Sequence, residues 1–365
     1  MTPAVLESPG ARTGIVVVGR NEGRRLVRCL DALTRLGLPT VYVDSGSTDG
    51  SVAEARARGL EVVELDRSTP FTAARARNEG WRRLAELDPA LELVQFVDGD
   101  CVLDDGWIPA GQAALRGAPR VAAVCGRRRE IAPEASLYNR LCDLEWDTEP
   151  GFDVDCGGDA LMRVAALREV GGFDPSLAAG EEPELCMRLR ARGHQVQRIG
   201  VEMTLHDAAI ERFSQWWNRA VRTGYTAAQF WHVRRTPLGR TRLRRVLSAI
   251  LWAAAVPTAV AASAWIAVGR GFPVGPSVCV AVLVALGSYA VPFTRARRGR
   301  LARGTRGADA TWYALFCLVG KVPELQGVLR FAAHRASGRR AALIEYKDVP
   351  SARESPPSAG LGGQA

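Results

Sequence analysis

Two long apolar runs without a charged residue constrain this 365-residue chain most strongly. Val246–Val268 is the first run, of 23 residues, and Phe272–Phe293 is the second, of 22 residues. Gly269-Arg270-Gly271 separates them. Each run is long enough to cross a hydrocarbon core of about 30 Å as a helix. The pattern therefore predicts a transmembrane helical hairpin rather than two helices buried in a soluble core.

The distribution of positive charge predicts how this hairpin is oriented. The formal net charge is +9, and arginines cluster at 234–245, 295–306 and 335–340, beside the apolar runs. Such flanks favour a membrane surface over nucleic acid as the partner, and the sequence has no aromatic-interleaved basic motif of a nucleic-acid-binding module. Both outer ends of the hairpin are expected in the cytoplasm. Residues 1–13 lack a signal-peptide pattern, so we expect a multi-pass protein of the inner (plasma) membrane with a cytoplasmic N-terminal domain.

The first 130 residues alternate between strand-type and helix-type segments. The predicted strands are Ile15–Val18, Val41–Asp44, Glu61–Leu65 and Leu93–Asp98, and the predicted helices are Gly23–Leu36, Ser51–Arg58 and Ala73–Leu87. This alternation predicts a parallel sheet with helices on both faces. Polar clusters follow the strands at the sheet edge where ligands bind in such folds.

The later segments are less regular. We expect a helix starting near Pro183, a strand over Gln197–Met203, an amphipathic helix over Glu211–Trp231 and an interfacial segment over Trp312–Val319. The predicted organisation is a flexible N-terminus (1–12), an α/β domain (13–210), an interfacial helix with a basic linker (211–245), the hairpin (246–293), a basic cytoplasmic or interfacial segment (294–347) and a disordered tail (348–365).

Asp98-Gly99-Asp100 closes the fourth predicted strand. Two carboxylates separated by one glycine can converge on a hard cation such as Mg²⁺ or Mn²⁺, which keeps positions open for phosphate. The tripeptide alone is common in solvated turns, and its position at a strand end gives it weight. Asp44 ends the second strand, where its carboxylate can accept hydrogen bonds from a base or a ribose. The residues that follow can instead cap the next helix, and the two roles are compatible.

Several segments together resemble the family 2 glycosyltransferases. They are Ile15–Gly23, Val43–Gly50, Ala76-Arg77-Asn78-Glu79-Gly80, Asp98-Gly99-Asp100, Gly157–Arg163 and Val170–Asp174. The resemblance covers roughly residues 13–205, with the motifs in the right order. It implies the GT-A fold, a nucleotide-sugar donor, a divalent metal and inversion at the anomeric carbon.

The same resemblance implies roles for individual residues. The nucleotide-sugar side comprises Asn21, Glu22, Asp44, Arg77, Asn78, Asp98 and Gly99, and the acceptor side comprises Gly157, Gly158 and Asp159. Asp98 and Asp100 belong to the metal motif. His206 is either a third metal ligand or a packed or exposed side chain. Glu182 stands where the family carries its catalytic base, which is an aspartate, and Glu181 is the competing candidate for the base. Alternatively, either carboxylate could only interact favourably with the dipole at the start of a helix.

These features predict a metal-dependent, inverting transfer of a sugar to a hydroxyl of a lipid-linked or saccharide acceptor at the cytoplasmic membrane face. A role in cell-surface or exopolysaccharide biosynthesis would fit. Two alternatives stay open. A nucleotidyltransferase would use a related α/β sheet, but no glycine loop bearing arginine and lysine occurs near the start. A catalytically inactive membrane scaffold would not need the carboxylates Asp98, Asp100 and Glu182.

Overall fold

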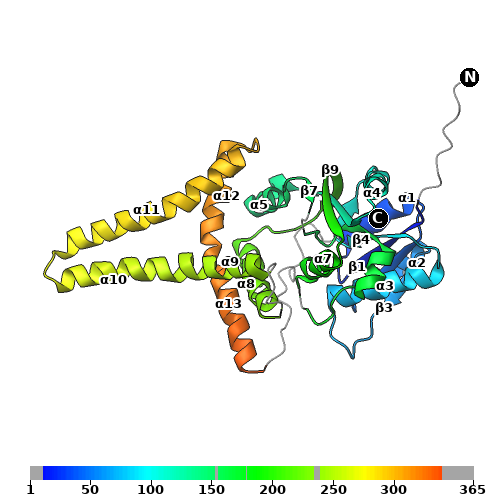
Figure 1. Cartoon of the computed structure of the whole chain (residues 1–365), viewed down its shortest axis with the longest axis horizontal. Helices are drawn as coiled ribbons and strands as arrows, with labels where there is room; N and C mark the ends of the chain where they lie inside the picture. The colour runs from blue at the N-terminus through cyan, green and yellow to red at the C-terminus, as the bar shows by residue number, and fades with distance from the viewer. Residues whose placement is uncertain (1–10, 153–154, 178, 234–238, 339–365) are drawn as a thin grey trace, which may run out of the picture.

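The computed structural model describes residues 11–152, 155–177, 179–233 and 239–338. An α/β body carries a long helical hairpin that projects away from it, and further helices lie between the two (Figure 1). Residues 1–10 of the predicted flexible N-terminus lie outside the described residues, as do the predicted disordered tail and residues 234–238 of the basic linker.

One nine-stranded sheet forms the centre of the α/β body. Its strands are β1 (Thr13–Gly19), β2 (Thr40–Asp44), β3 (Glu61–Glu64), β4 (Leu93–Asp98), β5 (Cys101–Leu103), β6 (Val121–Glu130), β7 (Gly151–Phe152), β8 (Ala160–Arg163) and β9 (Gln195–His206). They are ordered β3-β2-β1-β4-β8-β6-β9-β5, and β7 pairs with β9 off this path. Strands β1 to β4 are parallel, but β8 runs antiparallel to β4 and to β6. The predicted parallel sheet is confirmed for β1–β4, whereas the later strands make the whole sheet mixed.

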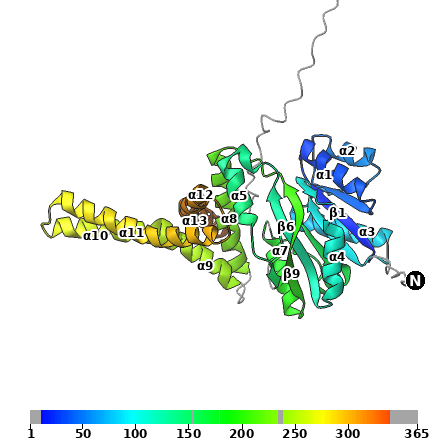
Figure 2. The ribbon, with the colours of Figure 1, turned by 90° about the horizontal axis from the view of Figure 1, so that it is seen from above.

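Helices cover both faces of this sheet (Figure 2). They are α1 (Arg24–Arg35), α2 (Ser51–Ala57), α3 (Ala73–Leu87), α4 (Trp107–Gly117), α5 (Leu137–Trp146), α6 (Val164–Val170) and α7 (Glu181–Ala191), with a 3₁₀ turn at Pro133–Ala135. The predicted apolar face of α1 is confirmed, since Leu26, Leu30 and Leu33 are fully buried. Gly80 lets α3 approach the sheet closely, because a β-carbon there would overlap Val16. The core thus holds the carboxyl ends of β1, β2 and β4 at one edge.

The hairpin consists of two helical segments joined by a turn at Gly269-Arg270-Gly271. The C-terminal helices are α8 (Phe213–Val233), α9 (Gly239–Ile250), a π-helical turn (Leu251–Ala255), α10 (Val256–Gly269), α11 (Val274–Leu301), α12 (Gly307–Val319) and α13 (Lys321–Ala336). Arg242–Gly269 and Val274–Leu301 are long and apolar enough to cross a membrane. Only 6 % of each apolar window is buried inside the protein, so these are not core helices of a soluble domain.

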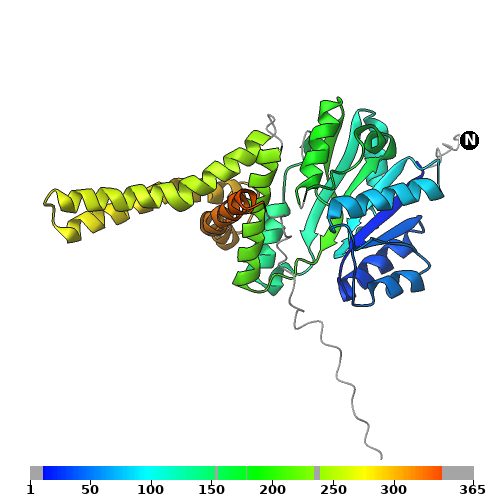
Figure 3. The same ribbon diagram turned by 90° about the horizontal axis from the view of Figure 1, so that it is seen from below.

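Helices α12 and α13 run across the base of the hairpin (Figure 1). Helix α13, coloured orange to red, packs on α8 (Figure 3), and α12 packs on α11. Two glycines permit the α8–α13 crossing, since a β-carbon at Gly224 would overlap the backbone of Glu324 and one at Gly327 would overlap the backbone of Val221. The predicted interfacial segment is the main part of α12.

The predicted amphipathic helix is observed as α8. Trp216 near its start is buried, whereas Phe213 is 47 % exposed. The physical reason is a partner from far along the chain: the ring of Phe316 on α12 lies 4.7 Å from that of Trp216, edge to face.

Candidate active site

The Asp98-Gly99-Asp100 segment lies at the carboxyl edge of the parallel strands, between β4 and β5. The Gly99 backbone N–H donates to the Val18 carbonyl oxygen of β1 at 2.8 Å. A β-carbon at Gly99 would come within 3.2 Å of that same oxygen. Glycine therefore lets the segment turn tightly across the end of β1, and both flanking aspartates project from this edge.

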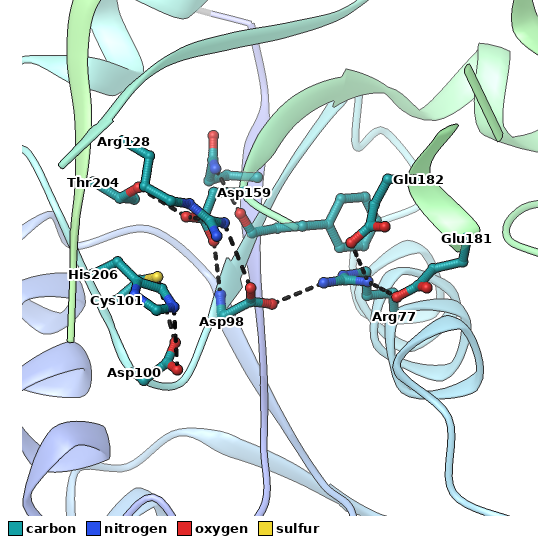
Figure 4. Close-up of polar contacts among 12 residues, drawn as sticks. Arg77, Asp98, Asp100, Cys101, Arg128, Asp159, Glu181, Glu182, Thr204 and His206 are labelled. Carbon is teal, nitrogen blue, oxygen red and sulfur yellow. Dashed lines mark hydrogen bonds and ion pairs between the residues drawn. The ribbon is translucent and has the colours of Figure 1, made fainter. Parts of the chain in front are cut away.

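Arg77 of α3 connects the two halves of the site (Figure 4). Its Nη2 donates to Asp98 Oδ1 at 2.8 Å, and its Nη1 donates to Glu181 Oε1 at 2.7 Å. The same Nη1 lies 3.3 Å from Glu182 Oε1. Arg77 is 2 % exposed. A single buried guanidinium thus holds the metal-motif carboxylate and the two candidate bases in one cluster.

A second arginine, Arg128 of β6, supports Asp98 from the other side. Its Nη2 lies 2.7 Å from Asp159 Oδ2 and 3.5 Å from Asp98 Oδ2. Asp159 is fully buried, accepts the Asp98 backbone N–H at 3.0 Å and accepts the Thr204 hydroxyl at 2.8 Å. These bonds tie β8 and β9 to the end of β4. Asp159 therefore positions the metal motif and has no open face toward an acceptor.

Arg128 and Thr204 were not singled out by the sequence. The available signal was the run Arg127-Arg128-Arg129 at the polar end of an otherwise apolar strand. Alternation along a strand places the middle arginine on the opposite face from its neighbours.

Charge and burial move two pKa values in opposite directions. Burial raises the pKa of Asp98, but Arg77 and Arg128 more than offset it and lower that pKa to about 2. Burial, followed by the neighbouring Glu181, raises the pKa of Glu182 to about 7, although Arg77 opposes this. Asp98 is therefore an anion at neutral pH, while Glu182 exchanges its proton near pH 7. That is the range in which a general base works best.

Asp100 and His206 form a candidate metal pair. They sit at the paired ends of β5 and β9, with His206 Nε2 3.4 Å from Asp100 Oδ2. The Cys101 thiol lies within the same group of potential ligands. His206 Nδ1 is buried, and among the described residues it has no hydrogen-bond partner. A carboxylate and an imidazole fit Mn²⁺ or a similar divalent ion. Asp98, in contrast to Asp100, already pairs with two arginines, Arg77 and Arg128.

The predicted nucleotide side is a pair of interlocked loops. Asp44 Oδ2 accepts the backbone N–H groups of Gly46 and Ser47, both at 2.8 Å, and Oδ1 accepts the Tyr42 hydroxyl at 2.9 Å. Asn21 has a left-handed backbone with φ 53°, and its Oδ1 accepts the Thr48 N–H at 2.7 Å. Asp44 and Asn21 thus shape the loop beside the sheet edge. Glu22 pairs with Arg25 at 3.0 Å at the start of α1.

The Asn78 side chain is buried and bonded within the protein. Its side-chain amide donates to the Phe173 carbonyl at 2.7 Å and its Oδ1 accepts the Phe173 N–H at 2.9 Å. Asn78 is 3 % exposed. It therefore clamps the turn before α7 to α3, and so fixes where the Glu181–Glu182 pair stands.

Comparison with known proteins identifies the class to which this fold and site belong. Residues 14–171 match the family model described as glycosyl transferase family 2. The succinoglycan biosynthesis protein ExoA of Rhizobium meliloti is 25 % identical over 313 residues, which cover 77 % of this chain and 93 % of that protein. A pre-mycofactocin glycosyltransferase of Mycobacterium tuberculosis is 27 % identical over 207 residues, covering 53 % of this chain and 42 % of that protein.

A solved structure agrees on the fold. The mannosyltransferase PcManGT from Pyrobaculum calidifontis, in complex with GDP-Man and Mn²⁺, superposes with a TM-score of 0.54 at 19 % identity, over 90 % of this chain and 91 % of that one. The α/β body therefore has the GT-A fold. Residues 14–171 match glycosyl transferase family 2, and the chain is a glycosyltransferase that takes its sugar from a nucleotide-sugar donor.

Proposed function

We propose that this enzyme catalyses a metal-dependent, inverting transfer of a sugar to a hydroxyl group of a lipid-linked or saccharide acceptor at the cytoplasmic face of the plasma membrane. The observation that carries the proposal is the Arg77 cluster, in which one buried guanidinium joins Asp98 to Glu181 and Glu182. A role in exopolysaccharide or other cell-surface polymer biosynthesis is supported by the likeness to ExoA.

On the donor side, Asp100 and His206 would hold a divalent cation, Mg²⁺ or Mn²⁺. When bound, such an ion neutralises the diphosphate leaving group of the donor. The Mn²⁺ in the structure of PcManGT supports this assignment. Asp98, kept ionised by Arg77 and Arg128, accepts hydrogen bonds from the donor's ribose or orients the adjacent Asp100. Asp44 and Asn21 hold the loop that faces the nucleotide.

On the acceptor side, Glu182 removes the proton from the attacking hydroxyl. The hydroxyl oxygen forms a bond to the anomeric carbon while the bond from that carbon to the diphosphate oxygen breaks. The nucleoside diphosphate leaves with the electron pair, and configuration inverts. Glu181, held at 2.7 Å by Arg77, positions that arginine and raises the pKa of its neighbour. The Glu182 side chain is 18 % exposed, against 7 % for Glu181, so Glu182 is the better placed of the two to meet an acceptor.

The membrane location is proposed from the hairpin. Its large apolar side chains face outward: Trp265 is 79 % exposed, and Leu283 is 66 % exposed. Burying them in lipid removes apolar surface that water would otherwise contact. The domain boundaries proposed for the chain follow the same division, with the catalytic body at 13–210 and the hairpin at 246–293.

A two-step experiment tests the proposal. The full chain is screened by thermal shift against nucleotide sugars with Mn²⁺, because a ligand that binds the folded state raises its unfolding temperature. The stabilising donor is then incubated with membrane lipid extract. We expect a glycosylated product and a nucleoside diphosphate, both lost in Glu182→Gln. Pyrophosphate as product would instead indicate a nucleotidyltransferase. Unchanged cellular glycans in an Asp100→Ala strain would support the inactive scaffold.

A further inference from the structure

Helix α5 packs both on strand β6 of the catalytic body and on α12 beside the hairpin (Figure 1). Its last residue, Trp146, contacts two groups of the candidate site. The Trp146 ring lies edge to face against the His206 imidazole of β9, with the ring centroids 4.7 Å apart. The Arg128 guanidinium of β6 lies over the same indole, 5.8 Å from its centroid. One indole therefore borders both the candidate metal ligand and the arginine that supports Asp98.

Packing, rather than a hydrogen bond, fixes the His206 ring. A histidine that binds a metal through one nitrogen usually donates its other N–H to a carboxylate or a carbonyl, which sets the orientation of the ring. His206 Nε2 lies 3.4 Å from Asp100 Oδ2, while the buried Nδ1 has no hydrogen-bond partner among the described residues. Because an edge-to-face pair of aromatic rings has a preferred geometry, the contact with Trp146 can orient the imidazole instead.

Two arginines hold the end of α5 that carries Trp146. They are Arg300, in the last turn of α11, and Arg303, just beyond it. The carbonyl oxygen of Asp147, the residue that ends α5, accepts Arg303 Nη1 at 2.7 Å and Arg300 Nη1 at 3.3 Å. Arg300 is 6 % exposed, and its guanidinium lies over the Tyr313 ring, 4.3 Å from the centroid. Cations at the C-terminal end of a helix bind its free carbonyl groups and interact favourably with its dipole. The second helix of the hairpin is therefore bonded to the residue next to Trp146.

We propose that Trp146 is a positioning residue for the metal site, whose indole orients the His206 imidazole toward the cation, and that Arg300 and Arg303 fix this indole to the base of the hairpin. The inference rests on the proposed function, because it takes Asp100 and His206 as the residues that hold the ion. It goes beyond that function by making the affinity for the metal depend on a helix of the hairpin.

Binding of Mn²⁺ to the full chain in detergent tests the role of Trp146. Free Mn²⁺ is measured by electron paramagnetic resonance, so the readout is independent of sugar transfer. Trp146→Ala should weaken Mn²⁺ binding by roughly 10-fold, since loss of a group that orients a metal ligand costs about 10–100-fold in affinity. Trp146→Phe keeps an aromatic ring and should restore part of the affinity. Trp312→Ala is the matched control, because Trp312 lies 46 % exposed on α12 and its loss should leave Mn²⁺ binding unchanged.

A double variant tests the link to the hairpin. Arg300→Met combined with Arg303→Met removes the donors to the Asp147 carbonyl, and it should weaken Mn²⁺ binding, by less than Trp146→Ala does. Arg298→Met is the control, because Arg298 is exposed on the same helix. Excess Mn²⁺ should restore sugar transfer by Trp146→Ala, whereas a variant that merely folds poorly would stay inactive at every Mn²⁺ concentration.

Equal Mn²⁺ affinity in Trp146→Ala and the wild type would overturn the inference, and equal affinity in the double arginine variant would overturn its hairpin part. Failure of the proposed function looks different. His206→Ala would then bind Mn²⁺ as tightly as the wild type, because His206 would not be a ligand. If His206→Ala weakens Mn²⁺ binding and Trp146→Ala does not, this inference alone is wrong.

Discussion

Gly158 lies directly against the carboxylate of Asp98, with no room for a side chain between them. A β-carbon at Gly158 would overlap Asp98 Oδ2 and would come within 2.5 Å of Arg77 Nη2. Both partners are held in place from several sides, so neither can move away cheaply. The glycine-rich segment before β8 therefore packs against the Asp98–Arg77 ion pair through backbone atoms alone at Gly158.

We predict that Gly158→Ala abolishes most of the transfer activity. The added methyl must separate Asp98 from Arg77, and a displacement of about 1 Å at a catalytic centre can cost roughly 100-fold in rate. Overpacking should also lower stability by about 1–3 kcal/mol. Initial rates and thermal unfolding of the purified chain measure both. Gly117→Ala is the control, because a β-carbon there meets nothing within 4 Å. Activity near that of the wild type in Gly158→Ala would mean that the ion pair can separate freely.

Arg77→Met should be the most destabilising single change in the catalytic domain. It leaves Asp98, Glu181 and Glu182 together without their shared cation, and breaking a buried ion pair costs about 3–5 kcal/mol. We expect the unfolding temperature to fall by roughly 10 °C. Arg82→Met is the comparison on the same helix: that arginine is exposed and pairs with Glu79 at 3.5 Å, so its loss should cost less than about 1 kcal/mol. Similar unfolding temperatures for the two variants would argue against a stabilising role of Arg77 as the cation shared by the three carboxylates.

The activity should depend on pH through Glu182. The base works in its deprotonated form, and its pKa is raised to about 7 by burial and by Glu181. With saturating substrates the rate should therefore rise about tenfold per pH unit below pH 7 and level off above it. Glu182→Gln should lower kcat by about 10²–10⁴-fold and remove this rise. If Glu181→Gln removes the rise while Glu182→Gln keeps it, the two carboxylates have the opposite roles.

The first half of the fold could be predicted because its signals are local. The bounds of α3 and β4 coincide with those expected, since each is set by its own periodicity and by nearby polar residues. The antiparallel insertion of β8 between β4 and β6 depends on pairing between residues more than sixty positions apart. No local pattern specifies such a pairing.

The candidate site, like the fold, has a part that could be predicted from local sequence and a part that could not. The resemblance located Arg77 and Asn78 and assigned both to the nucleotide-sugar side, which stays a prediction. It did not indicate that both are buried and link segments within the protein. Their partners, Glu181 and Phe173, lie about a hundred residues away, so only the folded chain shows these links. Arg128 could not be predicted as a site residue for the same reason. An arginine in a strand is expected at the surface, and only the folded chain brings Asp159, just before β8, into contact with it.

His206 should set the metal preference. If Asp100 and His206 hold the ion, EDTA will abolish transfer and Mn²⁺ will restore it better than Mg²⁺, because imidazole suits the transition metals and Mg²⁺ prefers oxygen ligands. His206→Ala should raise the Mn²⁺ concentration needed for half-maximal activity. It should also reduce the preference of the enzyme for Mn²⁺ over Mg²⁺. Metal titrations of the activity measure both. His194→Ala is the control, since that side chain pairs with Glu169 away from the site, at 2.8 Å. An unchanged Mn²⁺ titration in His206→Ala would remove His206 from the metal site.

The hairpin should place its turn on the far side of the membrane from the catalytic body. Arg270 lies at that turn, and Gly304 lies at the opposite end, between α11 and α12. We expect Arg270→Cys to react with a membrane-impermeant maleimide in intact cells, and Gly304→Cys to react only after the membrane is opened. Cys279 lies on α11 in the uncharged run, so lipid should shield it in both variants. Labelling of Gly304→Cys in intact cells would contradict this topology. Absence of both variants from the membrane fraction would show that the exposed apolar faces of α10 and α11 are covered by a partner protein instead.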